Sequence, residues 1–157
     1  MLKICFVCHG NICRSVAAEY IFQDMVNKEG LSELFYIDSA ATSSEEIGNP
    51  VYPPMKRALE KEGIPIGNHH ARQLRKEDYE KYDFLIGMDA ENLWNMKRLF
   101  HDDPEKKVHL LMEYTDHPDE IIADPWYTRR FETCVYQLEK GCQGFMKYLN
   151  DQGIKQE

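Results

Sequence analysis

The sequence has no long hydrophobic run. A helix that spans a bilayer needs about 20 consecutive apolar residues, and no stretch of this chain approaches that length. The apolar stretch at residues 1–7 is too short for a secretory signal, and a cysteine and a glycine-containing loop follow it directly. We therefore expect a cytoplasmic protein that does not insert into membranes.

Basic residues are also scarce. The 157 residues include 27 acidic and 19 basic side chains, which gives a formal net charge of -8. Such a field repels nucleic acid unless a local basic patch overrides it, and no patch is obvious in the sequence. We expect no nucleic-acid partner, and we expect any anionic substrate to be captured by a local group of donors.

A disulfide framework, internal repeats and low-complexity linkers are absent as well. Five cysteines are an odd number in a chain without an export signal, which favours reduced thiols. A length of 157 residues with 43% hydrophobic residues suits one compact fold. We expect a single domain over residues 1–157, with a polar tail at about 151–157 that frays.

What the sequence does contain is an alternation of strand and helix patterns. Short apolar runs predict strands at residues 2–7, 34–37, 82–88 and 108–112. Apolar residues at helical spacing predict helices at about 17–28, 53–63, 90–100 and 131–149. This order predicts the α/β class, as a doubly wound sheet of about four parallel strands with helices on both faces. Such sheets bind ligands at the carboxyl ends of their strands.

The loop after the first strand carries the clearest chemical signal. It joins that strand to the first helix, and its sequence is Cys8-His9-Gly10-Asn11-Ile12-Cys13-Arg14-Ser15. The backbone amides and the helix N-terminus at such a junction form a concave site for an anion such as phosphate. The same positive potential favours the thiolate of Cys8, which can then act as a nucleophile.

Other side chains of the loop suit the same chemistry. The planar guanidinium of Arg14, at the start of the helix, can hold two phosphoryl oxygens. The hydroxyl of Ser15 can donate to the thiolate and help the sulfur to leave in a second step. Gly10 and Asn11 tolerate a left-handed backbone, which would turn successive amides inward.

The neighbouring cysteines call for separate interpretations. Residues three apart in a strand point to opposite faces, so we expect Cys5 in the core rather than in a redox or metal pair with Cys8. Cys13 lies in the curling loop. It either packs there or forms a reversible disulfide with Cys8 that shields the nucleophile from over-oxidation.

A general acid is also required, because a phenolate or alkoxide leaves faster when its oxygen is protonated. Asp124 is the candidate among the acidic residues, since an apolar approach at residues 121–123 leads into Asp124-Pro125, a turn stiffened by proline. The rings of Trp126 and Tyr127 can wall a slot for an aryl group and partly desolvate the acid. An ordinary Asp-Pro turn is the alternative from these residues alone.

Several segments, in order along almost the whole chain, resemble low-molecular-weight protein tyrosine phosphatases. They are Cys8-x-Gly10-Asn11-Ile12-Cys13-Arg14-Ser15, Asp38-Ser39-Ala40-Ala41-Thr42-Ser43, Ile47-Gly48-Asn49-Pro50, Ala71-Arg72-Gln73, Met88-Asp89 and Asp124-Pro125-Trp126-Tyr127. The resemblance implies hydrolysis of phosphotyrosine in protein substrates through a phosphocysteine intermediate. It further implies inorganic phosphate as product and no metal or cofactor.

The resemblance also implies catalytic roles for matching residues. Cys8 is the nucleophile, Arg14 the phosphate clamp and Ser15 the donor to the thiolate. Asp124 is the general acid and then the base for the water that cleaves phosphocysteine.

Binding and support roles follow from the same resemblance. The loop from His9 to Ser15 binds the phosphate. Asn11, Ser39 and His69 hold the loop by hydrogen bonds, with His70 beside His69 as the other candidate.

Departures from the family pattern concern the substrate rim, which we expect to comprise His9, Glu45, Trp126 and Tyr127. His9 stands where an apolar residue is common and Glu45 where an aromatic residue is common, so the peptide preference is altered. Ile12 is similar to the tyrosine-specific members.

We expect a monomer or a weak dimer. Three alternatives to the tyrosine phosphatase function stay open. Related protein-arginine phosphatases have Thr in place of Ile12. Arsenate reductases share the loop and fold but use a further cysteine near the third strand, where this chain has Gly87. A phosphate-binding module without turnover is the third alternative.

Overall fold

The computed structural model describes residues 1–153, and residues 154–157, part of the predicted fraying tail, lie outside the described residues. Four parallel strands form one sheet in the order β2-β1-β3-β4. Their bounds are β1 Leu2–Cys8, β2 Phe35–Ala41, β3 Phe84–Gly87 and β4 Val108–Leu110. The predicted α/β class with a doubly wound parallel sheet is confirmed. The strand order reverses between β1 and β3, the place where such sheets bind ligands.

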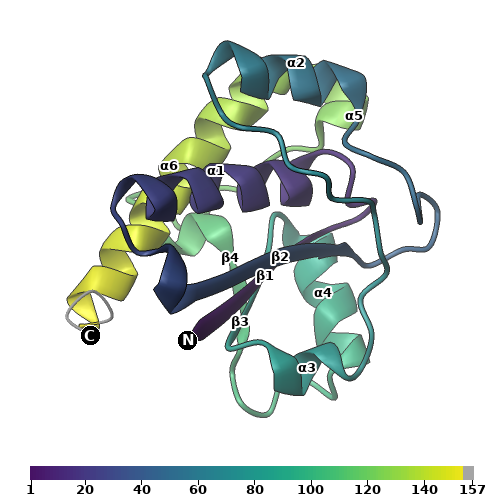
Figure 1. Cartoon of the computed structure of the whole chain (residues 1–157). Coiled ribbons are helices and arrows are strands. Elements are labelled where there is room, and N and C mark those ends of the chain that lie inside the picture. Colours follow the sequence, from purple (N-terminus) through teal and green to yellow (C-terminus); the bar gives the residue numbers. More distant parts are fainter. Residues whose placement is uncertain (154–157) are drawn as a thin grey trace.

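Helices cover both faces of the sheet (Figure 1). One face carries α1 Arg14–Lys28, α2 Pro53–Lys61 and α6 Phe131–Asp151, with the short α5 Pro125–Thr128 beside α2. The other face carries α3 Asp78–Lys81 and α4 Ala90–Leu99. Two short 3-10 helices, η1 Ser32–Leu34 and η2 Leu111–Tyr114, complete the elements of the described residues.

The central strand β1 separates two hydrophobic cores. Ile4, Phe6 and Cys8 belong to the core under α1 and α6, whereas Cys5 and Val7 belong to the core under α4. This alternation explains why the strand is apolar throughout, because both of its faces are buried. It also confirms that Cys5 and Cys8 point to opposite faces.

Three strand boundaries differ from the sequence prediction by two residues or more, and β1 ends at Cys8 itself instead of just before it. β2 extends to Ala41, beyond the predicted 34–37, because polar Asp38 and Ser39 find hydrogen-bond partners and keep pairing with β1. β3 begins at Phe84 instead of residue 82, since residues 78–81 form α3, a helix that the prediction missed. β4 ends at Leu110 instead of residue 112, where the chain turns into η2 to bury Leu111.

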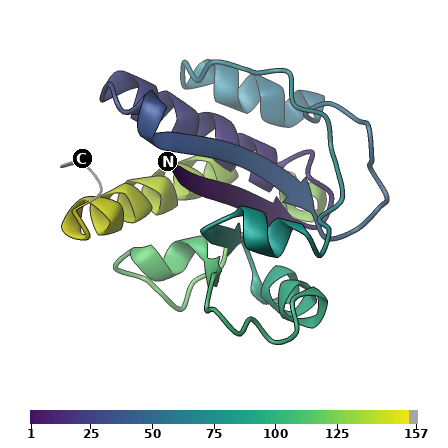
Figure 2. The same ribbon diagram turned by 60° about the horizontal axis from the view of Figure 1, so that its bottom comes forward.

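The first two strands deliver their carboxyl ends to the same edge of the molecule (Figure 2). At that edge the loop after β1 and the long loop after β2 are bonded to each other, through Thr42 N to Cys8 O at 2.9 Å and Ser43 N to His9 O at 3.1 Å. Within residues 1–153, no helix combines the length and apolar character that a membrane span requires.

Candidate active site

A cavity of about 110 Å³ opens where β1 ends. Its lining joins the loop after β1 to three residues of the β4–α6 connection and two of the β2–α2 loop: Cys8, His9, Gly10, Asn11, Ile12, Cys13, Arg14, Glu45, Glu46, Asp124, Trp126 and Tyr127. The structure thus brings together the predicted nucleophile, clamp, acid and rim, although their positions in the sequence are more than 100 residues apart. Ser15 lies behind the cavity, where it is fully buried.

The sulfur of Cys8 accepts hydrogen bonds from several directions. The backbone N–H groups of Asn11 and Ser15 donate to Sγ at 3.3 and 3.4 Å. The Ser15 hydroxyl lies 3.0 Å from Sγ, and it accepts a bond of 2.7 Å from the Asn11 side-chain amide. Because that oxygen already accepts from Asn11, its own proton is available to Cys8. Three donors therefore converge on one sulfur, an arrangement that suits negative charge on that atom during a reaction.

The turn of the loop depends on one left-handed residue. Asn11 has a φ of 61°, as expected, but Gly10 is not among the residues with positive φ. The prediction for Gly10 was therefore wrong, since the asparagine alone makes the turn. A side-chain carbon at Gly10 would lie 3.5 Å from Glu46, an ordinary contact, so the glycine is not required there by strain.

Arg14 is buried with its guanidinium at the cavity. Nη1 donates to Asp89 Oδ2 at 2.7 Å and to the Ile122 carbonyl oxygen at 2.8 Å. Nη2 lies 3.5 Å from Asp124 Oδ2. Burial opposes the charge, but Cys8 and the two carboxylates outweigh it and raise the pKa of Arg14 above its ordinary value. The guanidinium is thus held as a fixed cation beside the sulfur.

Asp124 is positioned by the end of a helix. It is the N-cap of α5, where its Oδ1 accepts from the Trp126 N–H at 3.0 Å, and Pro125 occupies the first helical position. The cap leaves Oδ2 directed toward Arg14. A carboxyl group at the start of this helix therefore lines the same cavity as Cys8.

The predicted support residues form one connected network. His69 Nε2 lies 2.7 Å from Asn11 Oδ1 and 3.3 Å from Ser39 Oγ, whereas His70 is exposed and bonds only the carbonyl of Asn68. Between the two candidates, the structure places His69 against the loop. An amide oxygen can only accept, so His69 donates from Nε2 to Asn11.

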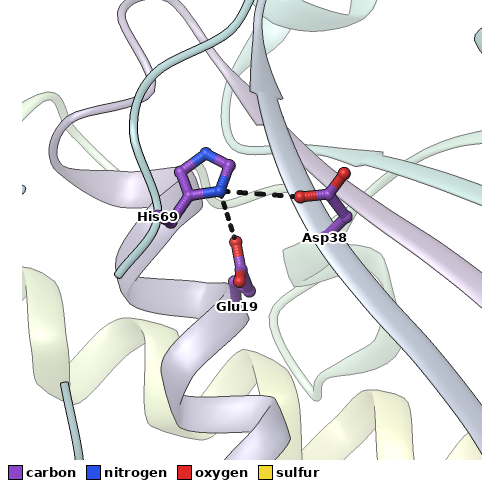
Figure 3. Close-up of side chains that lie close together, drawn as sticks. All are labelled: Glu19, Asp38 and His69. Carbon is purple, nitrogen blue, oxygen red and sulfur yellow. Dashed lines mark ion pairs between the residues drawn. The ribbon is translucent and has the colours of Figure 1, made fainter. Parts of the chain in front are cut away.

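The other ring nitrogen of His69 faces two carboxylates (Figure 3). Nδ1 lies 3.4 Å from Glu19 Oε1 and 3.6 Å from Asp38 Oδ1. Burial raises the pKa of Glu19 to about 7, and burial lowers the pKa of His69. These ligand atoms are close enough to share a cation, but Arg72 already lies 3.2 Å from Asp38.

The rim carries both acidic and aromatic residues. His9 lies between Glu45 at 3.1 Å and Glu91 at 3.6 Å, so the histidine that departs from the family pattern is paired with carboxylates. Trp126 and Tyr127, which also line the cavity, are 43% and 79% exposed and can contact a substrate.

The sequence analysis did not identify the residues that bind the predicted site residues by hydrogen bonds or ion pairs. Asp89 caps α4 and also binds Arg14, and its place directly after a predicted strand was the signal that could have found it. Glu19 and Arg72 reach the network from a helix and a loop. No local pattern marks Glu19, because only the packing of α1 against β2 brings it to Ser39.

Cys13 is buried at the N-cap of α1, and burial first, then the nearby Cys8, raise the pKa of its thiol. A raised pKa disfavours the thiolate needed for disulfide exchange. The proposed disulfide with Cys8 stays a prediction, and all five cysteines are unpaired in the structure.

Fold and site together define the class of this protein: a doubly wound α/β fold with a cavity centred on a cysteine at its switch point. The family model described as low molecular weight phosphotyrosine protein phosphatase matches residues 3–156. The chain therefore belongs to the family of low-molecular-weight protein tyrosine phosphatases.

Individual relatives agree along nearly the whole chain. The low molecular weight phosphotyrosine protein phosphatase of Gallus gallus is 40% identical over 149 residues, covering 92% of this chain and 94% of the relative. The low molecular weight protein-tyrosine-phosphatase YfkJ of Bacillus subtilis is 35% identical over 144 residues, covering 91% and 92%.

Solved structures give the same family fold. The crystal structure of YfkJ superimposes with a TM-score of 0.93 at 33% identity, covering 97% of this chain and 96% of that one. The crystal structure of DARP, a Drosophila arginine phosphatase, gives 0.85 at 29% identity, covering 94% and 97%.

Proposed function

We propose that this chain hydrolyses phosphotyrosine in protein substrates through a phosphocysteine intermediate. The observation that carries the proposal is the convergence of three donors on the sulfur of Cys8, two from the Asn11 and Ser15 amides and one from the Ser15 hydroxyl. A cysteine held as a thiolate is a strong nucleophile at neutral pH. Membership of the phosphatase family supports the same chemistry.

In the first step the Cys8 thiolate attacks the phosphorus atom, and the bond between phosphorus and the tyrosine oxygen breaks. The departing phenolate takes a proton from Asp124, which becomes a carboxylate. Arg14 and the inward-facing amides of residues 9–14 stabilise the charge on the transferred phosphoryl oxygens.

In the second step the Asp124 carboxylate takes a proton from a water molecule whose oxygen attacks the phosphorus of phosphocysteine. The bond between sulfur and phosphorus breaks, and the Ser15 hydroxyl donates to the sulfur as it leaves. Inorganic phosphate is released, with Cys8 again a thiolate and Asp124 again protonated.

The surroundings of the site support a phosphoprotein substrate in a reducing compartment. The rings of Trp126 and Tyr127 border the cavity and suit an aromatic leaving group. Five unpaired cysteines suit the cytoplasm. We propose one phosphatase domain over residues 1–157, present as a monomer or weak dimer.

Replacement of the nucleophile tests the proposal. We expect Cys8→Ser to lower kcat for p-nitrophenyl phosphate by more than roughly a thousandfold, because a serine hydroxyl is not ionised at neutral pH. Rapid quenching of the wild type should yield a peptide phosphorylated on Cys8. Thermal unfolding of the variant controls for loss of fold. Retained turnover in the variant, or loss of wild-type turnover on chelation of metals, would contradict the proposal.

Tyrosine phosphatase, arginine phosphatase and arsenate reductase activities are distinguished by comparing their substrates. Phosphotyrosine, phosphoarginine and arsenate with thioredoxin are compared on one enzyme preparation, and we expect the highest kcat/KM for phosphotyrosine. Ile12, at the position where related protein-arginine phosphatases have Thr, lines the cavity. A side-chain carbon at Gly87 would lie 2.9 Å from the Met96 methyl group and 3.0 Å from Asn92, so the further cysteine of an arsenate reductase would require these neighbours to shift.

A further inference from the structure

A second concave surface lies between α2 and the start of α6, and we call it the α2–α6 groove. It has a volume of about 650 Å³. Its lining consists of Pro54, Arg57, Ala58, Lys61, Arg129, Arg130, Phe131, Glu132 and Thr133. Four of these nine residues are basic and one is acidic, although the whole chain carries a formal charge of -8. The lining of the groove therefore has a net positive charge, opposite in sign to the net charge of the whole chain.

Two of the four cations have no partner within the protein. Arg57 and Arg130 are exposed, and neither side chain forms a hydrogen bond or an ion pair with any other residue of the described 1–153 segment. Lys61 is different, because it lies 2.6 Å from Glu132 and neutralises the single acid of the groove. The charge left over is positive and faces solvent.

The start of α6 adds to this positive potential. Phe131, Glu132 and Thr133 form the first turn of this 21-residue helix and line the groove. Its N-cap, Arg130, supplies no side-chain cap. The unsatisfied N–H groups and the dipole of a long helix favour an anion at this end.

Arg129 connects the groove to the active site. Its Cζ lies 5.4 Å from the Tyr52 ring, 5.9 Å from the Trp126 ring and 5.2 Å from the Phe131 ring, and Nη2 donates to the Tyr52 hydroxyl at 3.1 Å. Trp126 lines the catalytic cavity, whereas Arg129 lines the groove. Arg129 therefore links the lining of the groove to an aromatic residue of the cavity, and α2 and α5 lie side by side there (Figure 1).

The rim of the catalytic cavity carries charge of the opposite sign. Glu45 and Glu46 line the cavity, and Glu91 lies against His9. A peptide that inserts phosphotyrosine into the cavity therefore meets carboxylates at the rim and, beyond Arg129, the unpaired guanidinium groups of the groove. The two surfaces thus differ in charge.

We propose that the α2–α6 groove is an anion subsite that binds aspartate or glutamate side chains close to the phosphotyrosine of a substrate protein. The proposal rests on the proposed phosphatase function and deepens it. An extended peptide advances about 3.3 Å per residue, so acidic residues within a few positions of the tyrosine reach the groove. Exposed ion pairs are individually weak, and two of them give a preference of roughly three- to tenfold.

The first experiment compares phosphopeptides that differ by charge alone. Each peptide carries two glutamates or two glutamines, placed either before or after the phosphotyrosine. We expect kcat/KM to be roughly three- to tenfold higher for glutamate on one of the two flanks, and we expect 0.5 M NaCl to weaken this preference because the pairs are exposed, with a screening length of only about 4 Å.

The second experiment removes the two unpaired cations in Arg57→Gln/Arg130→Gln. We expect the preference for the glutamate peptide to fall below about twofold. The matched control is Lys76→Gln/Lys97→Gln, which removes two exposed positive charges on the other face of the sheet and should keep the preference. Each kcat/KM is divided by the value for p-nitrophenyl phosphate, which is too small to reach the groove.

The outcomes separate the two proposals. Equal rates for glutamate and glutamine peptides on both flanks, or a preference that survives Arg57→Gln/Arg130→Gln, would overturn the subsite. Loss of the preference in the control variant would assign it to net charge and also overturn the subsite. Failure of the wild type to hydrolyse p-nitrophenyl phosphate or any phosphotyrosine peptide would instead contradict the proposed phosphatase function.

Discussion

The hydrogen bonds around Cys8 are oriented so that the sulfur accepts from its neighbours. The side-chain oxygen Oδ1 of Asn11 accepts from the backbone N–H of Arg72 at 3.2 Å and from His69 Nε2 at 2.7 Å. The side-chain nitrogen Nδ2 of Asn11 is then oriented to donate to the Ser15 hydroxyl. Ser15 is then left with its proton for Cys8. A single orientation of one asparagine thus supplies a donor to the nucleophile.

The role of Asp124 is tested by the leaving group. We expect Asp124→Ala to slow release of a poor leaving group, such as an alkyl-substituted phenolate, roughly 10²–10⁴-fold, the range of general acid catalysis. Release of p-nitrophenolate should slow much less, because this anion leaves without a proton. The measurement is the slope of log kcat against leaving-group pKa. An equal loss for all leaving groups would contradict the role as acid.

The buried carboxyl of Glu19 makes stability depend on pH. Its folded pKa of about 7 lies above the ordinary 4.5, so the folded chain binds more protons between these values and its stability falls as pH rises through that window. The contribution amounts to about 3 kcal/mol. His69 acts in the opposite direction, because its pKa is lowered.

Glu19→Gln isolates this contribution. We expect the variant to gain stability relative to the wild type between pH 5 and pH 8, by up to about 3 kcal/mol, since glutamine has no proton to lose. Urea unfolding at the two pH values measures the difference, and Glu60→Gln on the exposed side of α2 is the control. A difference that does not change with pH would show that Glu19 is ionised throughout.

At the scale of elements, the site is built from the ends of strands and helices. Asp89 follows β3, caps α4 by accepting from the Asn92 N–H at 2.9 Å, and binds Arg14 of α1 at 2.7 Å. Asp124 likewise caps α5 and faces the same guanidinium. Two helix caps therefore hold the guanidinium of Arg14, the proposed phosphate clamp, which couples its position to the formation of those helices.

The packing of α6 against η2 depends on glycine. A side-chain carbon at Gly144 would overlap the carbonyl oxygen of Tyr114, a backbone atom that cannot move aside. We expect Gly144→Ala to lower the free energy of unfolding by about 1–3 kcal/mol, since overpacking outweighs the better helix propensity of alanine.

Urea unfolding measures this effect. Gln143→Ala, at the exposed neighbouring position, is the matched control and should stay within about 0.5 kcal/mol of the wild type. A Gly144→Ala variant as stable as the wild type would mean that α6 and η2 can separate without cost.

At the scale of the whole molecule, the proposed anion site joins segments from both halves of the chain. Cys8 and Arg14 lie near the start, and Asp124 and Trp126 lie more than 100 residues later, yet all line one cavity. An anion bound there contacts groups that come together only in the folded state. Its binding energy therefore adds to global stability.

Product binding should stabilise the protein accordingly. Inorganic phosphate at roughly one hundred times its dissociation constant is expected to add about 2.7 kcal/mol to the free energy of unfolding. Sodium chloride at equal ionic strength is the control for screening. Arg14→Lys should lose most of the phosphate effect, because an ammonium lacks the planar fork. An equal effect of phosphate on both proteins would place the anion elsewhere.

Local sequence was sufficient for the order of the four strands and the four longer helices and for the loop that carries Cys8 and Arg14, but not for the short helix α3. The reason is that apolar periodicity and the strand-loop-helix junction are properties of neighbouring residues. Only tertiary structure decided that Gly10 needs no left-handed backbone, that His69 rather than His70 meets Asn11, and that Glu19 lies beside both. Those outcomes depend on contacts between residues far apart in the chain, which no local pattern records.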